Sequence, residues 1–188
     1  MSAPQPSINP TVFQGPPAAS FGRSQKELAV YSLLDRLGVP YLRLDHDPLP
    51  TIEACREADR LLNTQVCKNL FLCNAQKTSF YLLMLPGWKK FRASALSKQI
   101  GSSRLSFADP CFMAELLGTA PGSVSVLGLM NDKNNRVRLL IDQDILNQEF
   151  IGCHPCVNTS SLKLRTSDLL TVILPAVGHS HTPVTLPA

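Results

Sequence analysis

Residues 65–85 constrain the fold of this chain more than any other segment. Two apolar runs, 65–73 and 79–85, are separated by the polar residues 74–78. Apolar runs of this length, joined by a short polar turn, predict two antiparallel β-strands that form a hairpin. A chain of 188 residues is long enough to bury such a hairpin in the core of one domain.

The first predicted strand carries two polar residues, Lys68 and Asn69, inside an otherwise apolar run. An ammonium group that is buried without a partner is costly. Lys68 therefore either extends its ammonium group to solvent at the strand end or binds an anion at the mouth of a site. The neighbouring Cys67 would point to the opposite face of the strand, which predicts a core thiol rather than a nucleophile.

Positive charge is concentrated in one part of the sequence. The interval 61–108 contains no acidic residue and seven of the 18 lysines and arginines. The rest of the chain carries −3, from 11 basic and 14 acidic residues, although the net charge of the whole is +4. Such a span predicts a surface that attracts phosphate groups. A basic, solvated face without a ligand is the alternative interpretation.

Several classes of site are excluded by the motifs that the sequence lacks. The pair Cys153-x-x-Cys156 has no second pair at zinc-finger spacing, so we predict no metal site. Phosphate-binding loops, dinucleotide-binding fingerprints and the motifs of serine hydrolases and zinc proteases are also absent. No apolar run is long enough to span a bilayer and no secretory signal is evident, which predicts a cytoplasmic protein without a membrane partner.

The order of the predicted elements indicates one α+β domain. Helices are predicted at 24–37, 51–62, 93–99, 110–117 and 166–174, and strands at 41–44, 65–73, 79–85, 124–130, 136–141 and 161–164. This order predicts a mixed, mostly antiparallel sheet flanked by helices. The proline-rich residues 1–22 predict a flexible tail, residues 23–175 the folded domain, and residues 176–188 a second tail. The absence of a long heptad pattern favours a monomer.

Three glycine-bearing segments could form a pocket together with Lys68. Gly122 lies in the PGS turn at 121–123, Gly128 lies in the predicted strand 124–130, and Gly152 precedes His154 in the sequence GCHP. Glycine lets the backbone approach a ligand closely. Taken separately, Gly128 is more simply explained by packing, and His154 by a structural hydrogen bond.

Four motifs in this order resemble the YbaK/ProX family. They are KNLFL at 68–72, PGSVS at 121–125 with Gly128 and Leu129, GCHP at 152–155, and Asn158. Within the family, the similarity is to the ProX branch of free-standing prolyl-tRNA synthetase associated domain proteins, and it covers residues 24–175. The resemblance implies a mixed, barrel-like sheet flanked by helices and no metal or organic cofactor. Val126 and Leu127 depart from the Pro-Phe pair that is common in the family.

The resemblance also implies an activity. Such a protein would hydrolyse the ester of a mischarged tRNA in trans, and Ala-tRNA(Pro) is the expected substrate. The expected partner is the acceptor end of tRNA, and prolyl-tRNA synthetase or translation factors are further candidates. A non-catalytic tRNA- or synthetase-binding module that keeps the fold is the alternative.

The residues that carry this activity follow from the same resemblance. The implied catalytic residues are Lys68, Gly128, Gly152 and His154. The implied substrate-binding residues are Asn69, Ser123, Leu129, Pro155 and Asn158. The residues expected to contact tRNA phosphates are Lys89, Lys90, Arg92, Lys98 and Arg104. Backbone N–H groups near Gly128 and Gly152 are expected to hold the oxyanion or a water molecule.

Overall fold

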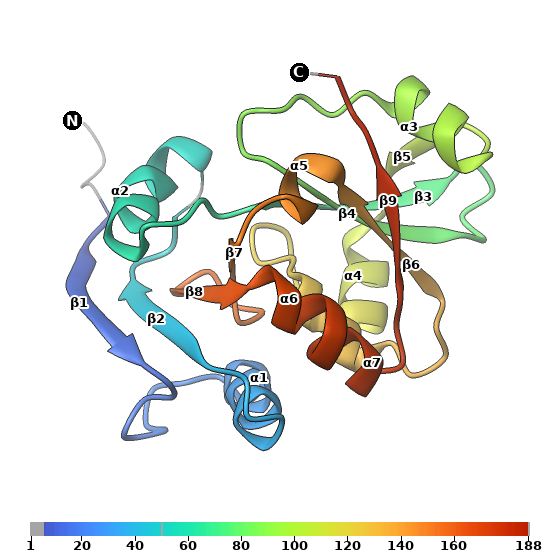
Figure 1. Cartoon of the computed structure of the whole chain (residues 1–188). Helices are drawn as coiled ribbons and strands as arrows, with labels where there is room; N and C mark the ends of the chain where they lie inside the picture. The colour runs from blue at the N-terminus through green and yellow to red at the C-terminus, as the bar shows by residue number, and fades with distance from the viewer. Residues whose placement is uncertain (1–5, 50, 188) are drawn as a thin grey trace, which may run out of the picture.

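The computed structural model describes residues 6–49 and 51–187, which form two β-sheets and their covering helices (Figure 1). The first sheet has four strands in the order β1-β2-β8-β7, all paired antiparallel. Its strands are β1 (Ile8–Gln14), β2 (Tyr41–His46), β7 (Phe150–Cys153) and β8 (Ser160–Arg165).

The second sheet has five strands in the order β5-β3-β4-β6-β9. They are β3 (Lys68–Asn74), β4 (Phe80–Leu85), β5 (Leu105–Phe107), β6 (Val137–Asp142) and β9 (His181–Val184). β3 pairs antiparallel with β4 and β5, whereas β6 pairs parallel with β4 and β9. The predicted α+β class and the mixed, mostly antiparallel pairing are confirmed. Neither sheet closes on itself within the described residues, so a barrel is not seen.

Four helices begin and end near predicted positions: α1 (Gln25–Arg36), α2 (Ile52–Leu62), α3 (Ala93–Ile100) and α4 (Pro110–Leu117). Two short helices lie outside the predicted helices, α5 (Gln143–Leu146) and the 3₁₀ helix η1 (Val126–Asn131). A C-terminal helix contains α6 (Thr166–Asp168), the π-helical η2 (Leu169–Ile173) and α7 (Leu174–Ala176). Ser24 caps α1 by accepting a hydrogen bond from the backbone N–H of Glu27, as the sequence predicts. No helix in residues 6–49 and 51–187 is long and apolar enough to cross a membrane.

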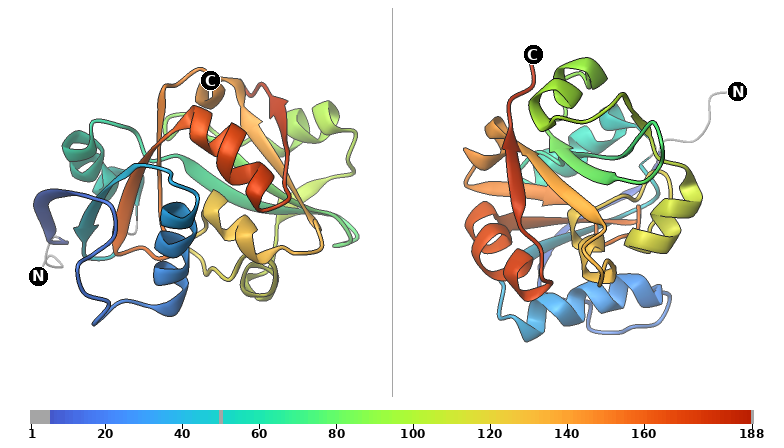
Figure 2. Two further views of the ribbon diagram at one scale, coloured as in Figure 1. Left: turned by 60° about the horizontal axis from the view of Figure 1, so that its bottom comes forward. Right: turned by 90° about the vertical axis from the view of Figure 1, so that its right-hand side faces the viewer.

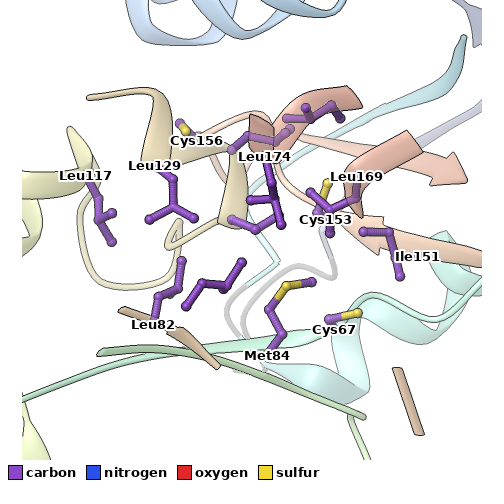
Figure 3. Packing of buried hydrophobic residues seen from close by; sticks show 14 of the residues in the cluster. Cys67, Leu82, Met84, Leu117, Leu129, Ile151, Cys153, Cys156, Leu169 and Leu174 are labelled. Atoms are coloured by element: carbon purple, nitrogen blue, oxygen red, sulfur yellow. The ribbon is translucent and has the colours of Figure 1, made fainter. Parts of the chain in front are cut away.

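The main hydrophobic core lies between the two sheets (Figure 3). Met84 of the five-stranded sheet and Ile151 of the four-stranded sheet both contribute to it, and Leu169 closes it from the C-terminal helix. The other faces of the sheets carry smaller clusters. α2 packs Ala58 and Leu62 against the four-stranded sheet, and α3 packs Leu96 against the five-stranded sheet. Each sheet is therefore covered on both faces.

Both predicted tails contain strands, and this corrects the sequence analysis. Ile8–Gln14 forms β1 beside β2, and the Phe13 ring lies 4.7 Å from the Arg43 guanidinium carbon. His181–Val184 forms β9 beside β6, and Figure 2 shows this C-terminal strand in red along the sheet edge. These short segments pair with strands that are distant in sequence. Residues 1–5 and 188 lie outside the described residues.

The segment 124–130 is not the predicted strand but mostly the 3₁₀ helix η1. The Ser125 hydroxyl accepts a hydrogen bond from the Leu127 N–H, and the Ser125 carbonyl accepts one from the Gly128 N–H at 3.0 Å. A short apolar run fits a buried strand and a buried helix equally well, so periodicity could not separate them. The side-chain cap of Ser125 is the local feature that decides between them.

Candidate functional site

A cavity of about 300 Å³ lies between β3 and the loop that follows β7. It is lined by Leu49, Thr51, Cys55, Val66, Cys67, Lys68, Asn69, Leu70, Gly122, Val124 and His154. Its volume is at the lower end of the range for small-molecule sites, about 300–1,000 Å³. Three predicted site residues, Lys68, Asn69 and His154, therefore share one cavity although 86 positions separate the first from the last.

The cavity borders an uncovered edge of β3. β4 pairs with residues 68–73 of this strand, whereas β5 pairs only with residues 72–74. The first half of β3 therefore has a neighbouring strand on one side only. This arrangement leaves room beside Lys68 and Asn69 for a ligand.

Lys68 places a cation at the cavity wall. Its Nζ donates a hydrogen bond of 2.8 Å to the carbonyl oxygen of Lys89, and its side chain is half-buried. Among the ion pairs of the described residues, none includes Lys68. An ammonium group has three donors, so two remain after the bond to Lys89. This arrangement suits an anionic or carbonyl oxygen of a ligand.

Asn69 supplies an acceptor beside this cation. Its Nδ2 donates to the Cys67 carbonyl oxygen at 3.1 Å, while its Oδ1 is buried with no hydrogen-bond partner. A buried polar atom without a partner is costly and rare in folded proteins. A ligand that donates a hydrogen bond to Oδ1 would remove this cost.

Lys89 corrects one of the predicted tRNA contacts. Its side chain is only 4% exposed, and its Nζ pairs with Asp142 at 2.8 Å and with Asp144 at 2.9 Å. Asp142 also accepts the backbone N–H of Leu186, which ties the C-terminal segment to this ion pair. Lys89 is therefore not available to phosphates. Its carbonyl oxygen instead holds Lys68 in place.

The remaining basic residues of the span are exposed as the sequence predicts. Their side chains reach solvent at Lys90, Arg92, Lys98 and Arg104. Lys90 and Arg92 belong to the turn that contacts Lys68, because both lie within three residues of Lys89. Their contact with tRNA stays a prediction.

Glycine is required at position 152 because the backbone of Gln65 and Val66 passes very close to it. A Cβ atom there would lie 2.7 Å from the Gln65 carbonyl oxygen and 2.8 Å from the Val66 Cα. The Gly152 N–H already donates to Gln65, and its carbonyl accepts from the Cys67 N–H, both at 3.0 Å. These bonds attach the end of β7 to the start of β3. The N–H of Gly152 is thus not free to hold an oxyanion, which corrects that expectation.

His154 follows on the same wall and is buried. Its Nδ1 donates a hydrogen bond of 2.9 Å to the Ser160 carbonyl, so the neutral ring keeps Nε2 as an acceptor. Burial lowers the pKa of His154, and the neighbouring His46 lowers it further. The two imidazole rings lie 6.1 Å apart in an edge-on arrangement. The cavity therefore contains a neutral imidazole at physiological pH.

His46 supports this wall from outside the cavity. Its Nδ1 donates to the Asp47 carbonyl, and its Nε2 accepts from the Ser161 hydroxyl, both at 2.8 Å. Burial also lowers the pKa of His46. Both buried imidazoles are neutral and have hydrogen-bond partners in the protein. His46 is the last residue of β2 and is followed by Asp47 and Pro48, and this local sequence gives no signal of its role.

Four other predicted residues lie in the supporting structure. Gly128 packs against α4, where an added Cβ would lie 2.9 Å from the Leu117 carbonyl oxygen, and its N–H is bonded within η1. This contradicts the expectation that its N–H is free for the substrate. Leu129 is fully buried in the main core, and Pro155 is also buried. The Ser123 hydroxyl closes the preceding turn by donating to Ala120.

Asn158 holds the opposite rim of the cavity. Its Oδ1 accepts the N–H of Leu49 at 3.1 Å, and its Nδ2 donates to the Leu49 carbonyl at 2.9 Å. Leu49 itself lines the cavity. In this structure Asn158 therefore positions a wall residue through two bonds to its backbone.

The cysteines near the cavity are not activated. Burial raises the pKa of both Cys67 and Cys156 to about 12, and raises that of Cys153 well above its ordinary value. A thiol of this kind stays protonated and is a poor nucleophile. Within the described ranges, no group of three or more His, Cys, Asp or Glu residues could hold a metal ion.

The apolar part of the lining could not be identified from the sequence. Leu49, Leu70 and Val124 come from three separate segments and line the cavity beside Gly122. An apolar residue gives no local signal that it faces a cavity and not the core. Only the PGS turn at 121–123 indicated that this segment approaches a ligand.

Comparison with known protein families identifies the family to which the chain belongs. Residues 46–172 match the family described as aminoacyl-tRNA editing domain, and this match includes both walls of the cavity. The chain belongs to the aminoacyl-tRNA editing domain family. The match begins after α1, so β1 and α1 lie outside it.

Relatives and a solved structure agree with this assignment. The chain is 31% identical to the prolyl-tRNA editing protein ProX of Acetoanaerobium sticklandii, over 77% of the chain and 88% of that protein. It is 30% identical to prolyl-tRNA synthetase associated domain-containing protein 1 of Mus musculus, over 78% of the chain and 90% of that protein. A crystal structure described as a putative trans-editing enzyme for prolyl tRNA synthetase shares the fold with a TM-score of 0.62 at 18% identity, covering 87% of the chain and 99% of that structure.

Proposed function

We propose that this protein hydrolyses the ester bond of mischarged aminoacyl-tRNA in trans, with Ala-tRNA(Pro) as the substrate. The observation that carries the proposal is the cavity that contains Lys68, Asn69 and His154, between β3 and the loop that follows β7. Membership of the editing-domain family and the similarity to ProX support it. The similarity to ProX extends over 88% of the length of that protein.

The reaction requires little chemistry from the protein, because an ester is already activated relative to an amide. The oxygen of a water molecule attacks the ester carbonyl carbon, and the bond from this carbon to the ribose oxygen breaks. One proton of the water passes to the leaving ribose oxygen, which yields a free amino acid and intact tRNA. The enzyme must place the water and stabilise the negative oxygen of the intermediate.

Lys68 is the group that we assign to this negative oxygen or to the adjacent phosphate. Its bond to the Lys89 carbonyl fixes the ammonium group and leaves two donors for the substrate. A charged donor stabilises an oxyanion more strongly than a neutral one. A Schiff-base role is excluded by the chemistry, because the substrate is an ester and not an aldehyde or ketone.

Asn69 and His154 are assigned to the aminoacyl group and the water. The unpartnered Oδ1 of Asn69 would accept a hydrogen bond from the α-ammonium group of the amino acid. His154 would offer its unprotonated Nε2 to the water, because its Nδ1 is already bonded to Ser160. The lowered pKa of His154 keeps this acceptor available at neutral pH.

The apolar lining of the cavity is the basis for the expected amino-acid preference. Leu49, Leu70 and Val124 belong to this lining. A small pocket rejects a larger side chain by steric exclusion, which discriminates better than attraction of one methyl group. We therefore propose that alanine enters and the bulkier proline ring, which belongs on this tRNA, is excluded.

One observation favours a second candidate, a tRNA- or synthetase-binding module without catalysis. Gly128 and Gly152 donate their N–H groups within the protein, so neither can bind an oxyanion. A module of this kind would keep the affinity for tRNA and release no amino acid. Prolyl-tRNA synthetase remains a proposed partner under either function.

The decisive experiment measures release of alanine from Ala-tRNA(Pro). We expect turnover by the wild-type protein and a loss of about a hundredfold or more in Lys68→Ala, as when one oxyanion donor is removed. The exposed Lys133 provides a matched control, and Lys133→Ala should keep the wild-type rate. Absence of turnover in the wild type would exclude the enzyme. Full turnover in Lys68→Ala would exclude the role assigned to Lys68.

A further inference from the structure

Trp88 is a large aromatic side chain that the fold leaves in solvent. It is 56% exposed and is the single tryptophan of the chain. Large aromatic residues usually bury most of their surface, since they contribute strongly to core stability. The main core does not use Trp88, and the catalytic roles assigned above do not involve it.

The backbone that carries Trp88 is firmly held. The Lys89 N–H donates to the Pro86 carbonyl at 3.1 Å, which closes a tight turn around Gly87 and Trp88. The Lys89 Nζ is buried between Asp142 and Asp144 and lies 5.4 Å from the centre of the Trp88 ring. A cation at this distance from an aromatic face attracts the ring. The indole is therefore presented on an anchored turn.

The same turn is in direct contact with the cavity. The carbonyl oxygen of Lys89, the residue after Trp88, accepts the hydrogen bond from Lys68. Lys68 lines the cavity. Whatever enters the cavity past Lys68 therefore passes close to the turn that carries the indole.

The segment that carries Trp88 also carries exposed cations. Lys90 and Arg92 are exposed on it, and the interval 61–108 contains no acidic residue. The nearby carboxylates of Asp142 and Asp144 are both paired with the Nζ of Lys89. An exposed aromatic ring followed by exposed cations matches single-stranded nucleic acid, because bases stack on the ring and phosphates pair with the cations. A protein surface that docks by apolar contacts alone would not require these charges.

We propose that Trp88 is a stacking platform for a base in the single-stranded 3′ end of the tRNA substrate. This inference rests on the proposed function, because it assumes that an aminoacylated RNA end enters the cavity beside Lys68. Trp88 binds the base next to the esterified nucleotide and so fixes the depth to which the end enters. Lys90 and Arg92 hold the phosphates that follow. Trp88 is a positioning residue and takes no part in the chemical step.

The single tryptophan makes the test direct. The probe is an uncharged RNA minihelix that copies an acceptor stem and ends in single-stranded ACCA. The control is the same minihelix with abasic nucleotides in the overhang, which keeps every phosphate. We expect the fluorescence of Trp88 to be quenched by the first RNA and much less by the second.

Variants test the same contact through affinity, measured by fluorescence anisotropy of the labelled minihelix. Trp88→Ala should weaken binding by about 5- to 150-fold, which corresponds to the loss of one stacked base. Trp88→Phe should retain most of the affinity because it keeps an aromatic face. The matched control is Phe21→Ala, which removes a 97% exposed aromatic side chain from the loop before α1 and should change nothing.

The outcomes separate this inference from the proposed function. Equal quenching by the intact and abasic RNAs, or equal affinity of Trp88→Ala and wild type, would overturn the stacking role. Turnover of Ala-tRNA(Pro) could persist in that case, and Trp88 would then be a candidate contact for a protein partner. Quenching that depends on the bases, without turnover, would support the stacking role and overturn the proposed deacylase activity. When turnover is present, Trp88→Ala should raise KM and leave kcat nearly unchanged.

Discussion

Two walls of the cavity, at β3 of the five-stranded sheet and at the loop that follows β7 of the four-stranded sheet, are positioned in different ways. The wall from the five-stranded sheet carries a charge, and its geometry depends on the ion pairs of Lys89 with Asp142 and Asp144 beneath Lys68. The wall from the four-stranded sheet is neutral, and its geometry depends on the absence of a side chain at Gly152. One wall is positioned by electrostatics and the other by close packing. Different substitutions should therefore disrupt the geometry of the two walls.

The largest loss is expected where the charged wall is anchored. Lys89→Met leaves the carboxylate of Asp142 buried without its cation, which should lower the free energy of unfolding by about 3–5 kcal/mol. Urea denaturation measures this change. The neighbouring Lys90 is exposed, so Lys90→Met should cost less than about 0.5 kcal/mol. Similar losses in the two variants would show that the buried ion pair does not anchor this wall.

An added methyl group tests the neutral wall. Gly152→Ala places a Cβ within 2.8 Å of backbone atoms at Gln65 and Val66, and overpacking of this kind costs about 1–3 kcal/mol. The same urea experiment applies, together with the deacylation rate, since His154 lies two residues away. Thr159→Ala, at an exposed position of the following loop, is the control. A Gly152→Ala protein as stable as this control would contradict the packing argument.

Acidification should weaken the neutral wall selectively. Burial lowers the pKa of both His46 and His154, so the unfolded chain binds more protons than the folded one once the pH falls below about 6.5. Stability is then complete above this pH and decreases as the pH falls through the lower pKa values of the folded state. Thermal unfolding between about pH 7.5 and pH 5 measures this loss of stability, and the melting temperature should fall by about 2–4 °C for each kcal/mol.

A matched variant identifies the source of this acid sensitivity. His154→Gln removes one of the two imidazoles, so its melting temperature should depend less steeply on pH between these limits than that of the wild type. Lys133→Ala is a control outside the cavity, and its pH dependence should follow the wild type. An unchanged slope in His154→Gln would show that other groups cause the loss.

The smallest effect is expected at the rim of the charged wall. Lys90→Ser and Arg92→Ser should leave stability unchanged and weaken tRNA binding, since each side chain is exposed. Each lost contact with a phosphate of the single-stranded end should reduce the slope of log affinity against log salt by about 0.7. Binding measured at several salt concentrations checks this, and Lys133→Ser serves as the reference. Unchanged slopes would place the tRNA contacts elsewhere.

The sequence predicted this site where the signal was local. Lys68 and Asn69 interrupt an apolar strand, and His154 lies in a short motif, so each could be identified from its neighbours. The helix cap at Ser24 and the hairpin strands were predicted correctly for the same reason. These features depend on residues within a few positions of one another.

The wrong predictions concern features that depend on contacts between residues distant in sequence. Lys89 looked like a surface cation, and its acidic partner Asp142 lies 53 positions away. β1 and β9 looked like tails because the strands they pair with, β2 and β6, are distant in sequence. The occupied N–H group of Gly152 likewise depends on Gln65. Periodicity and propensity contain no information about such pairings.

The partner of Lys68 is a main-chain atom, and this has a consequence for how the site can evolve. Every amino acid at position 89 supplies the same carbonyl oxygen, so substitution there cannot delete the contact itself. Positions 89, 142 and 144 can instead change together, because buried ion pairs are often replaced without loss, provided that position 142 keeps an acceptor for the backbone N–H of Leu186. Among descendants of this protein, we expect these three positions to covary while Lys68 stays constant.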